Sequence, residues 1–225
     1  MDCNTMESNL KASIAKELLK IGAVFLRPDE PFTWASGIKS PIYCDNRLTL
    51  SYPKTREKIE KAFAQTIAEK FPQVDRLMGT STAGIPHAAI AGYLLQLPMG
   101  YVRGSAKDHG RTNQIEGVLQ KGDSVVVIED LISTGGSSVD TVLALRKAGA
   151  KVEGIVSIFT YGMKKAEEKL AENNVTAHSL CDLDSLAKVV VKEGYITETG
   201  RQQLLAFRNN PADESWIDGG NSAGK

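Results

Sequence analysis

The segment best suited to chemistry is an apolar run followed by two acids and a turn rich in glycine and hydroxyl groups. It reads Val125-Val126-Val127-Ile128-Glu129-Asp130-Leu131-Ile132-Ser133-Thr134-Gly135-Gly136-Ser137-Ser138. The β-branched run over 124–128 predicts a buried strand, and a helix is predicted to begin at Ser137. A turn that opens a helix offers unpaired N–H groups and a partial positive charge to an anion, and glycine allows close backbone approach. The segment therefore predicts a phosphate-binding turn.

The two adjacent acids, Glu129 and Asp130, come directly before this turn. Carboxylates repel a phosphate, so they fit poorly if phosphate is the only ligand. They fit the hydroxyl groups of a sugar whose phosphate sits on the turn. The alternative is that the acids cap the next segment and the glycines only connect a strand to a helix. The complete string favours a sugar-phosphate site, and it is neither a Walker loop nor a Gly-x-Gly-x-x-Gly dinucleotide turn.

The composition is that of an ordinary soluble domain, with 225 residues of which 42% are hydrophobic and 24% charged. Lys plus Arg and Asp plus Glu each total 27, and this zero net charge argues against a nucleic-acid partner. No apolar run approaches the about 20 residues of a membrane helix, and the first residues lack the pattern of a secretory signal. We therefore expect a cytoplasmic protein with no membrane partner. The odd number and wide spacing of Cys3, Cys44 and Cys181 predict reduced thiols.

The elements that must position these groups alternate along the chain. An amphipathic helix with a predicted cap at Ser8 comes first, and an irregular stretch with three prolines follows over 27–47. Strands are then predicted over 74–79, 99–102, 124–128, 152–159 and 176–181, with helices between them. Strands separated by helices form βαβ units. The prediction is an α/β fold with a central, mainly parallel sheet flanked by helices, and with a small N-terminal hood.

The same pattern predicts one domain over residues 1–208. Its hood covers about 8–50 and its core about 51–208, and the tail over 209–225 is predicted to be mobile because it holds few large apolar residues. The polar segment over 104–117 has three glycines and almost no apolar side chains. A loop of that length in a compact domain is more often functional than idle.

The strand, acid pair and Thr-Gly-rich turn resemble the signature of the type I phosphoribosyltransferases, which bind phosphoribosyl pyrophosphate (PRPP). Other segments resemble the orotate phosphoribosyltransferases within that family. They are Tyr101-Val102-Arg103-Gly104-Ser105-Ala106-Lys107-Asp108-His109-Gly110, Phe32-Thr33-Trp34-Ala35-Ser36-Gly37-Ile38-Lys39-Ser40-Pro41, Asp45-Asn46-Arg47 and Gly79-Thr80-Ser81-Thr82-Ala83-Gly84-Ile85-Pro86. The resemblance implies transfer of ribose 5-phosphate from PRPP to orotate, giving orotidine 5′-monophosphate and pyrophosphate, in pyrimidine biosynthesis.

The resemblance also implies the site residues. The implied PRPP-binding residues are Arg103, Lys107, His109, Glu129, Asp130, Leu131, Ile132, Ser133, Thr134, Gly135, Gly136 and Ser137. Lys107, Asp108 and His109 are the implied catalytic residues, and Ser133 is the implied contact to orotate. Mg²⁺ is the implied cofactor, held by pyrophosphate and ribose oxygens and water, so no residue is assigned as a metal ligand. The loop is expected to reach the neighbouring subunit's site, which implies a homodimer.

The physics of the implied reaction agrees with a cationic loop. Loss of pyrophosphate from the anomeric carbon leaves an oxocarbenium-like ribose and places charge on the leaving group. Cations on a glycine-flanked lid would neutralise that charge and then withdraw for product release. The alternative is a solvated surface loop, which is the interpretation we favour for Arg111.

Several positions depart from other orotate phosphoribosyltransferases. Some members carry lysine where this chain has Ala35, Ala83 and Gly104, and an arginine near Thr160. The carboxylate of orotate and the pyrophosphate therefore have fewer identified cations, and Lys39 and Arg47 are candidates to replace them. Tyr43 is a candidate to stack on the base, although a single aromatic residue more often belongs to a core.

Two other functions stay open. One is a regulatory protein that retains the sugar-phosphate site and binds RNA or DNA, which the zero net charge and the Lys107-Asp108-His109 run both disfavour. The other is a phosphoribosyltransferase for a different base. Ser133 stands where hypoxanthine-type enzymes place an acid, and this difference argues against a purine.

Overall fold

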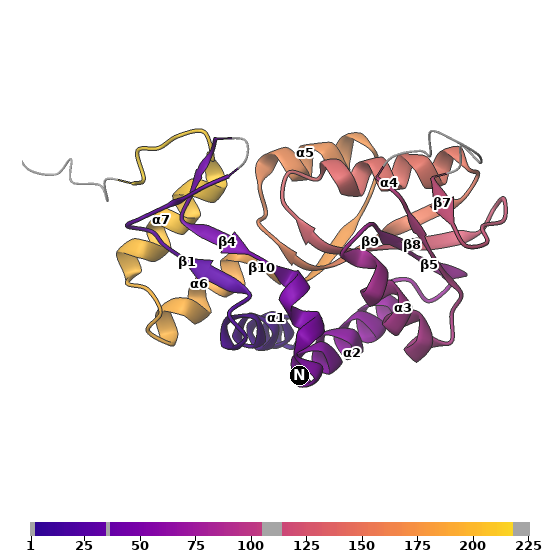
Figure 1. The fold of residues 1–225 in the computed structure, drawn as a ribbon, viewed down its shortest axis with the longest axis horizontal. Coiled ribbons are helices and arrows are strands. Elements are labelled where there is room, and N and C mark those ends of the chain that lie inside the picture. Colours follow the sequence, from indigo (N-terminus) through magenta and orange to yellow (C-terminus); the bar gives the residue numbers. More distant parts are fainter. Residues whose placement is uncertain (1–2, 35–36, 105–113, 218–225) are drawn as a thin grey trace, which may run out of the picture.

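The computed structural model describes residues 3–34, 37–104 and 114–217. At its centre lies a six-stranded sheet with the strand order β10-β9-β8-β5-β6-β7 (Figure 1). The strands are β5 (Arg76–Thr80), β6 (Met99–Val102), β7 (Ile115–Glu116), β8 (Ser124–Ile132), β9 (Lys151–Thr160) and β10 (Ala177–Asp182). Only β6 and β7 pair antiparallel, and the other neighbours in this sheet run parallel. The predicted α/β fold with a mainly parallel sheet is confirmed.

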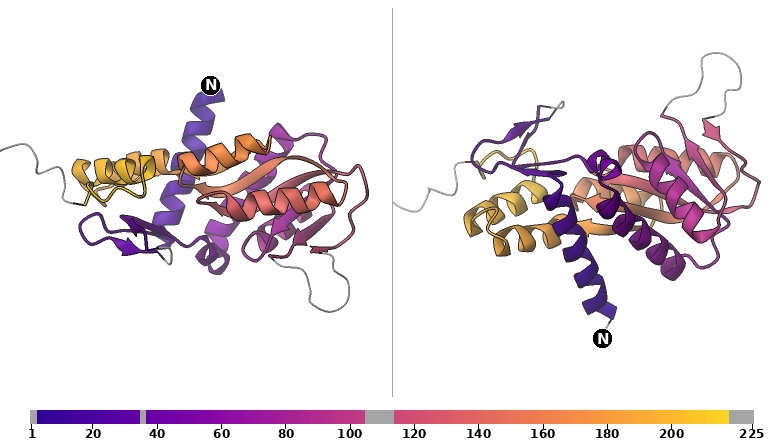
Figure 2. Two further views of the ribbon diagram at one scale, coloured as in Figure 1. Left: turned by 90° about the horizontal axis from the view of Figure 1, so that it is seen from above. Right: turned by 60° about the horizontal axis from the view of Figure 1, so that its bottom comes forward.

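Helices cover both faces of this sheet (Figure 1). The helices are α1 (Cys3–Lys20), α2 (Pro53–Lys70), α3 (Gly84–Leu95), α4 (Gly136–Lys147), α5 (Lys164–Glu172), α6 (Leu183–Lys192) and α7 (Glu198–Asn209). One face carries α1, α2 and α3, and the other carries α4 and α5. Figure 2 shows that the N-terminal part of α1 projects beyond the rest of the chain. None of the helices within the described ranges is long and apolar enough to cross a membrane.

Strand β8 is buried on both faces because its successive side chains point to opposite sides of the sheet. Val126 and Ile128 join the core cluster that includes α2 and α3, whereas Val125 and Val127 join the cluster beneath α4. All four side chains are fully buried. This two-sided burial explains why the sequence shows a continuous apolar run here and not an alternating one.

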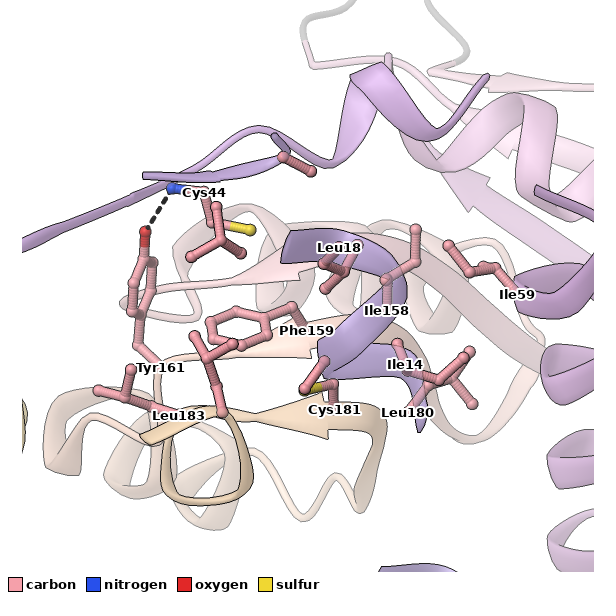
Figure 3. Close-up of a cluster of buried hydrophobic side chains, with 14 of the residues drawn as sticks. Ile14, Leu18, Cys44, Ile59, Ile158, Phe159, Tyr161, Leu180, Cys181 and Leu183 are labelled. Carbon is pink, nitrogen blue, oxygen red and sulfur yellow. Dashed lines mark hydrogen bonds between the residues drawn. The ribbon is translucent and has the colours of Figure 1, made fainter. Parts of the chain in front are cut away.

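The hood consists of two small antiparallel pairs and a 3₁₀ helix, η1 (Asn46–Ser51). The pairs are β1 (Val24–Leu26) with β4 (Ile42–Cys44), and β2 (Phe32–Thr33) with β3 (Lys39–Ser40). The Cys44 amide donates to the Tyr161 hydroxyl at 3.2 Å and so ties β4 to the end of β9 (Figure 3). Burial raises the pKa of both the Tyr161 hydroxyl and the Cys44 thiol.

The last two helices lie beside this N-terminal hood (Figure 1), although they are far from it in sequence. The Trp34 ring packs edge-on against Phe207 of α7, with centroids 5.7 Å apart. Trp216 is also buried and packs against Phe207, and its carbonyl accepts a 3.1 Å hydrogen bond from Gln203. The predicted mobility of 209–225 falls partly on residues outside the described ranges and stays a prediction, but Trp216 itself is packed into the fold.

Most predicted boundaries lie within two residues of the observed ones, and two differ by more. Helix α1 begins at Cys3, ahead of the predicted cap at Ser8. Strand β8 continues to Ile132, beyond the predicted end at 128. It does so because β9 runs alongside it as far as Thr160, so pairing continues through the acids although the apolar run has ended.

The start of α3 packs directly on the backbone of β8. A Cβ atom on Gly84 would overlap the carbonyl oxygen of Ile128, and one on Gly79 would lie only 2.9 Å from the carbonyl oxygen of Gly84. Glycine at 84 therefore permits the close approach of α3 to β8, and glycine at 79 permits the approach of β5 to α3.

We predict that Gly84→Ala lowers the free energy of unfolding by about 1–3 kcal/mol, since the methyl group forces backbone apart. Urea unfolding followed by circular dichroism measures this. Gly104→Ala is the control, because no atom of the described residues lies within 4 Å of a Cβ at that position. Equal stabilities for the two variants would contradict the packing role of Gly84.

Candidate active site

The site forms between β5 and β8, where successive connections leave in opposite directions along the sheet. From β5 the chain continues outward to β6, whereas β8, β9 and β10 build the sheet on the other side of β5. Strands β5 and β8 are therefore parallel neighbours with diverging connections. Ligands of open parallel sheets bind beyond the carboxyl ends of the strands at such a point. The turns after β5 and β8 both emerge there.

The turn after β8 has the geometry of an anion site. Gly135 is the N-cap of α4 with φ +74°, a left-handed conformation that favours glycine. No side chain caps this helix, and its first backbone bond runs from the Val139 amide to the Gly135 carbonyl at 3.1 Å. The amides of the first turn therefore lack helical acceptors, and the helix dipole adds positive charge beside them. Thr134 is half-buried and Ser137 exposed at this turn.

Glu129 is buried beside α4. Its Oε2 accepts a 3.0 Å hydrogen bond from the Ser138 hydroxyl, and its Oε1 accepts one from the Asp130 amide at 3.1 Å. Burial, together with the negative charge of Asp130, raises the pKa of Glu129 to about 8. At neutral pH Glu129 is therefore mainly protonated, which reduces its repulsion of an anionic ligand.

Asp130 lies toward the hood. Its backbone carbonyl accepts a 2.7 Å hydrogen bond from the side-chain amide of Asn46, which is buried at the start of η1. The Cys44 thiol in turn donates to the Asn46 side-chain oxygen at 3.2 Å. This chain of contacts fixes the end of β8 against the hood.

A cavity of about 890 Å³ opens between the hood and the end of β8. Asp130, Leu131 and Ser133 line it from the sheet. The hood and its neighbours contribute Phe25, Arg27, Phe32, Thr33, Trp34, Tyr43, Cys44, Asp45, Arg47 and Tyr161. Phe25 and Tyr43 are cross-strand partners and remain 42% and 40% exposed, so an aromatic surface faces open space. Such exposed aromatic groups suit a flat ring as ligand.

A second cavity, of about 600 Å³, lies between α1, α2 and β10. It is lined by polar side chains of both signs and by none of the predicted site residues. Its place away from the carboxyl ends of the strands separates it from the acid pair and the anion-binding turn.

The structure brings together some of the predicted site residues. Glu129, Asp130, Leu131 and Ile132 lie at the end of β8, and Ser133, Thr134, Gly135, Gly136 and Ser137 form the turn into α4. Arg103 follows β6, at the same edge of the sheet, and its amide donates to the Gln114 carbonyl at 2.8 Å. Lys107, Asp108 and His109 lie outside the described residues. Within the described part, no three His, Cys, Asp or Glu side chains gather as a metal site.

Sequence reasoning missed two features of the cavity. Asn46 was part of a matched motif but had no predicted role, and Arg27 was not singled out at all. The signal for Arg27 is its spacing of two residues from Phe25, which places both on the same side of an extended segment. Of the two candidate cations, Arg47 lines the cavity, whereas Lys39 is bound to the Thr33 hydroxyl at 2.7 Å and is not among the lining residues.

A mainly parallel sheet with a free helix N-terminus and an acid pair at its switch point is the arrangement expected of an α/β protein that binds a phosphorylated sugar. Comparison with known proteins agrees: the model of the phosphoribosyl transferase domain matches residues 50–188. Two orotate phosphoribosyltransferases, from Bacillus cytotoxicus and Bacillus cereus, are 56% and 55% identical over 208 residues, covering 92% of this chain and 99% of each relative. The chain belongs to the orotate phosphoribosyltransferase family.

Solved structures show the same fold. The orotate phosphoribosyltransferase of Aeropyrum pernix is 31% identical with a TM-score of 0.71, covering 81% of this chain and 99% of that one. The UMP synthase of Leishmania donovani is 29% identical with a TM-score of 0.76, covering 88% of this chain and 42% of that one.

We predict that Glu129→Gln flattens the pH dependence of stability. Because the pKa of Glu129 is raised in the folded state, its contribution is complete below pH 4.5 and is lost as the pH rises to about 8. Glutamine does not titrate, so between pH 5 and 9 the wild type should lose about 1–4 kcal/mol relative to the variant. Urea unfolding at several pH values measures this difference. Glu168→Gln on the exposed face of α5 is the control, and parallel profiles for wild type and Glu129→Gln would contradict the raised pKa.

Proposed function

We propose that this chain transfers the ribose 5-phosphate of PRPP to orotate, yielding orotidine 5′-monophosphate and pyrophosphate, in pyrimidine biosynthesis. The observation that carries the proposal is the cavity, which joins the end of β8 to an aromatic hood within one space. A sugar phosphate on the turn therefore has room for a flat base on its other side. The identity of 56% to an orotate phosphoribosyltransferase supports orotate as that base.

PRPP binds along the end of β8 in this proposal. The 5-phosphate is held at the turn of Thr134, Gly135, Gly136 and Ser137, where the free amides of α4 begin. Asp130 and Glu129 accept hydrogen bonds from the ribose hydroxyls, and Leu131 and Ile132 shape the strand end between acids and turn. Orotate lies in the hood half of the cavity, with Ser133 as its contact from the turn and Tyr43 beside its ring.

The reaction breaks the bond between the anomeric carbon and pyrophosphate and forms one to a ring nitrogen of orotate. Arg103 and the loop residues Lys107, Asp108 and His109 are proposed to surround the departing pyrophosphate. Their cations stabilise charge that is larger in the transition state than in the bound substrate. Mg²⁺ bound with PRPP would supply further charge neutralisation at the pyrophosphate. Of the two adjacent acids, Asp130 lines the cavity and Glu129 does not.

The assembly is proposed to be a cytoplasmic homodimer in which the loop reaches the neighbouring site. Tyr93 and Leu94 at the end of α3 are 74% and 44% exposed, which suits a surface covered by a second copy. Each chain is proposed to form one domain over 1–208, with a hood over about 8–50 and a core over about 51–208.

The purified protein should consume orotate in the presence of PRPP and Mg²⁺, since the cavity and the turn hold both reactants together. Loss of orotate absorbance measures the reaction, with release of pyrophosphate as an independent readout. Uracil, adenine and hypoxanthine serve as competing bases in parallel reactions. No loss of orotate, or faster turnover of another base, would overturn the assignment.

Lys107→Ala is expected to lower kcat by at least about a hundredfold while changing the KM for PRPP by less than about threefold, because the charge acts mainly in the transition state. Steady-state kinetics with each substrate varied in turn measures both constants. Lys164→Ala, an exposed cation on α5, is the control for general loss of charge. A KM increase as large as the fall in kcat would show that Lys107 serves binding instead.

A further inference from the structure

The base proposed for this cavity carries a carboxylate, and that carboxylate needs a partner. An anion moved from water into a closed site is unfavourable unless it is paired with a cation or strong donors. Among the described residues that line the cavity, two are cationic, Arg27 and Arg47. The contacts that each arginine already makes show which guanidinium is free to pair with the carboxylate of a ligand.

Arg47 is already engaged. Its Nε donates to Asp45 Oδ1 at 2.7 Å and its Nη2 donates to Asp45 Oδ2 at 2.8 Å. This two-bond pairing raises the pKa of the guanidinium and neutralises its charge locally. The same Asp45 carboxylate accepts from the Arg47 amide and caps η1, so the pair belongs to the structure of the hood.

Arg27 forms no ion pair within the described part of the chain. Its backbone amide donates to the Pro41 carbonyl at 2.8 Å, which extends the pairing of β1 with β4 by one step. The guanidinium carbon lies 5.0 Å from the centre of the Phe32 ring, a cation–π contact that orients the charged group. The Phe32 ring in turn lies 6.0 Å from the Tyr43 ring, centre to centre.

These contacts leave an oriented, unpaired guanidinium at the edge of the aromatic surface. A guanidinium presents parallel N–H donors that match a planar carboxylate, and the ring beneath it limits its rotation. The anion-binding turn at the start of α4 is a separate element and already offers its own donors to phosphate. Arg27 is therefore placed to meet an anionic group on a flat ring and not the sugar's phosphate.

We infer that Arg27 is the specificity-determining residue that binds the carboxylate of the pyrimidine substrate. This inference rests on the proposed function, and it adds the residue by which the site distinguishes orotate from pyrimidines without a carboxylate. Phe32 acts as a positioning residue for the guanidinium.

The test pairs one substitution with two ligands that differ only by the carboxylate. Arg27→Met removes the charge and retains an unbranched side chain. Orotidine 5′-monophosphate and uridine 5′-monophosphate are titrated into wild type and variant, with binding followed by calorimetry. The variant should bind orotidine 5′-monophosphate about tenfold more weakly and uridine 5′-monophosphate about equally well, because the charge-assisted bonds are made only to the carboxylate. The KM for orotate should rise by a similar factor while the KM for PRPP stays within about twofold.

Arg47→Met is the matched control from the same cavity, and it should leave the preference for the carboxylate-bearing ligand unchanged. Arg27→Lys keeps the charge without the planar fork and should retain part of the preference, even if Arg27→Met folds poorly. Loss of the preference in Arg47→Met but not in Arg27→Met would overturn the inference, as would a rise in the KM for PRPP instead of orotate. A wild type that consumes orotate yet binds both nucleotides equally would also overturn it, while leaving the proposed function intact.

Discussion

Strand β8 is the element on which the rest of the structure depends, because it must be apolar on both faces and polar at its end. Its first half is covered by α2 and α3 on one side and by α4 on the other. Its second half continues to pair with β9 as far as Ile132. At the acid pair, side chains complete the backbone hydrogen bonding, because the Asp130 amide donates to Glu129 and the Asp130 carbonyl accepts from Asn46. The strand pairing thus places two carboxyl groups at the end of the sheet, where Asp130 lines the cavity and Glu129 is buried beside α4.

The hood completes the site from the opposite direction. It holds little regular structure of its own, and a two-stranded pair is marginal without support. The support comes from the Tyr161 hydroxyl, from the Asn46 contact to Asp130, and from helix α7, whose Phe207 packs on Trp34. Segments from both ends of the chain therefore meet beside the carboxyl ends of β8 and β9, and the hood that they hold there forms one wall of the cavity. A change in α7 should be transmitted to the hood through Trp34 and Phe207.

Local signals in the sequence were sufficient for the sheet and for the turn. The apolar run over 124–128 and the glycine pair at 135 and 136 lead directly to a buried strand and a helix start, and both are present. The end of β8 was misplaced because strand pairing continues through polar residues when a neighbour is available. Arg27 was not found because its importance comes from Phe32 beneath it and from the pairing of β1 with β4, which link residues across an irregular stretch. The position of α6 and α7 beside the hood is likewise a long-range packing outcome that no local pattern reports.

The net charge of the chain is zero, but the charges around the cavity are not all paired with one another. Arg47 is paired with Asp45, so it contributes little field to the cavity, and Glu129 holds a proton at neutral pH because its pKa is about 8. Asp130 and Arg27 are then the groups near the cavity whose charges are not compensated by a partner of opposite sign among the described residues. They have opposite signs and match a ligand that presents hydroxyl groups at one end and a carboxylate at the other. Protonation of Glu129 keeps the acid pair from repelling the phosphate groups of the same ligand, so the burial that raises its pKa also makes the site compatible with a polyanion.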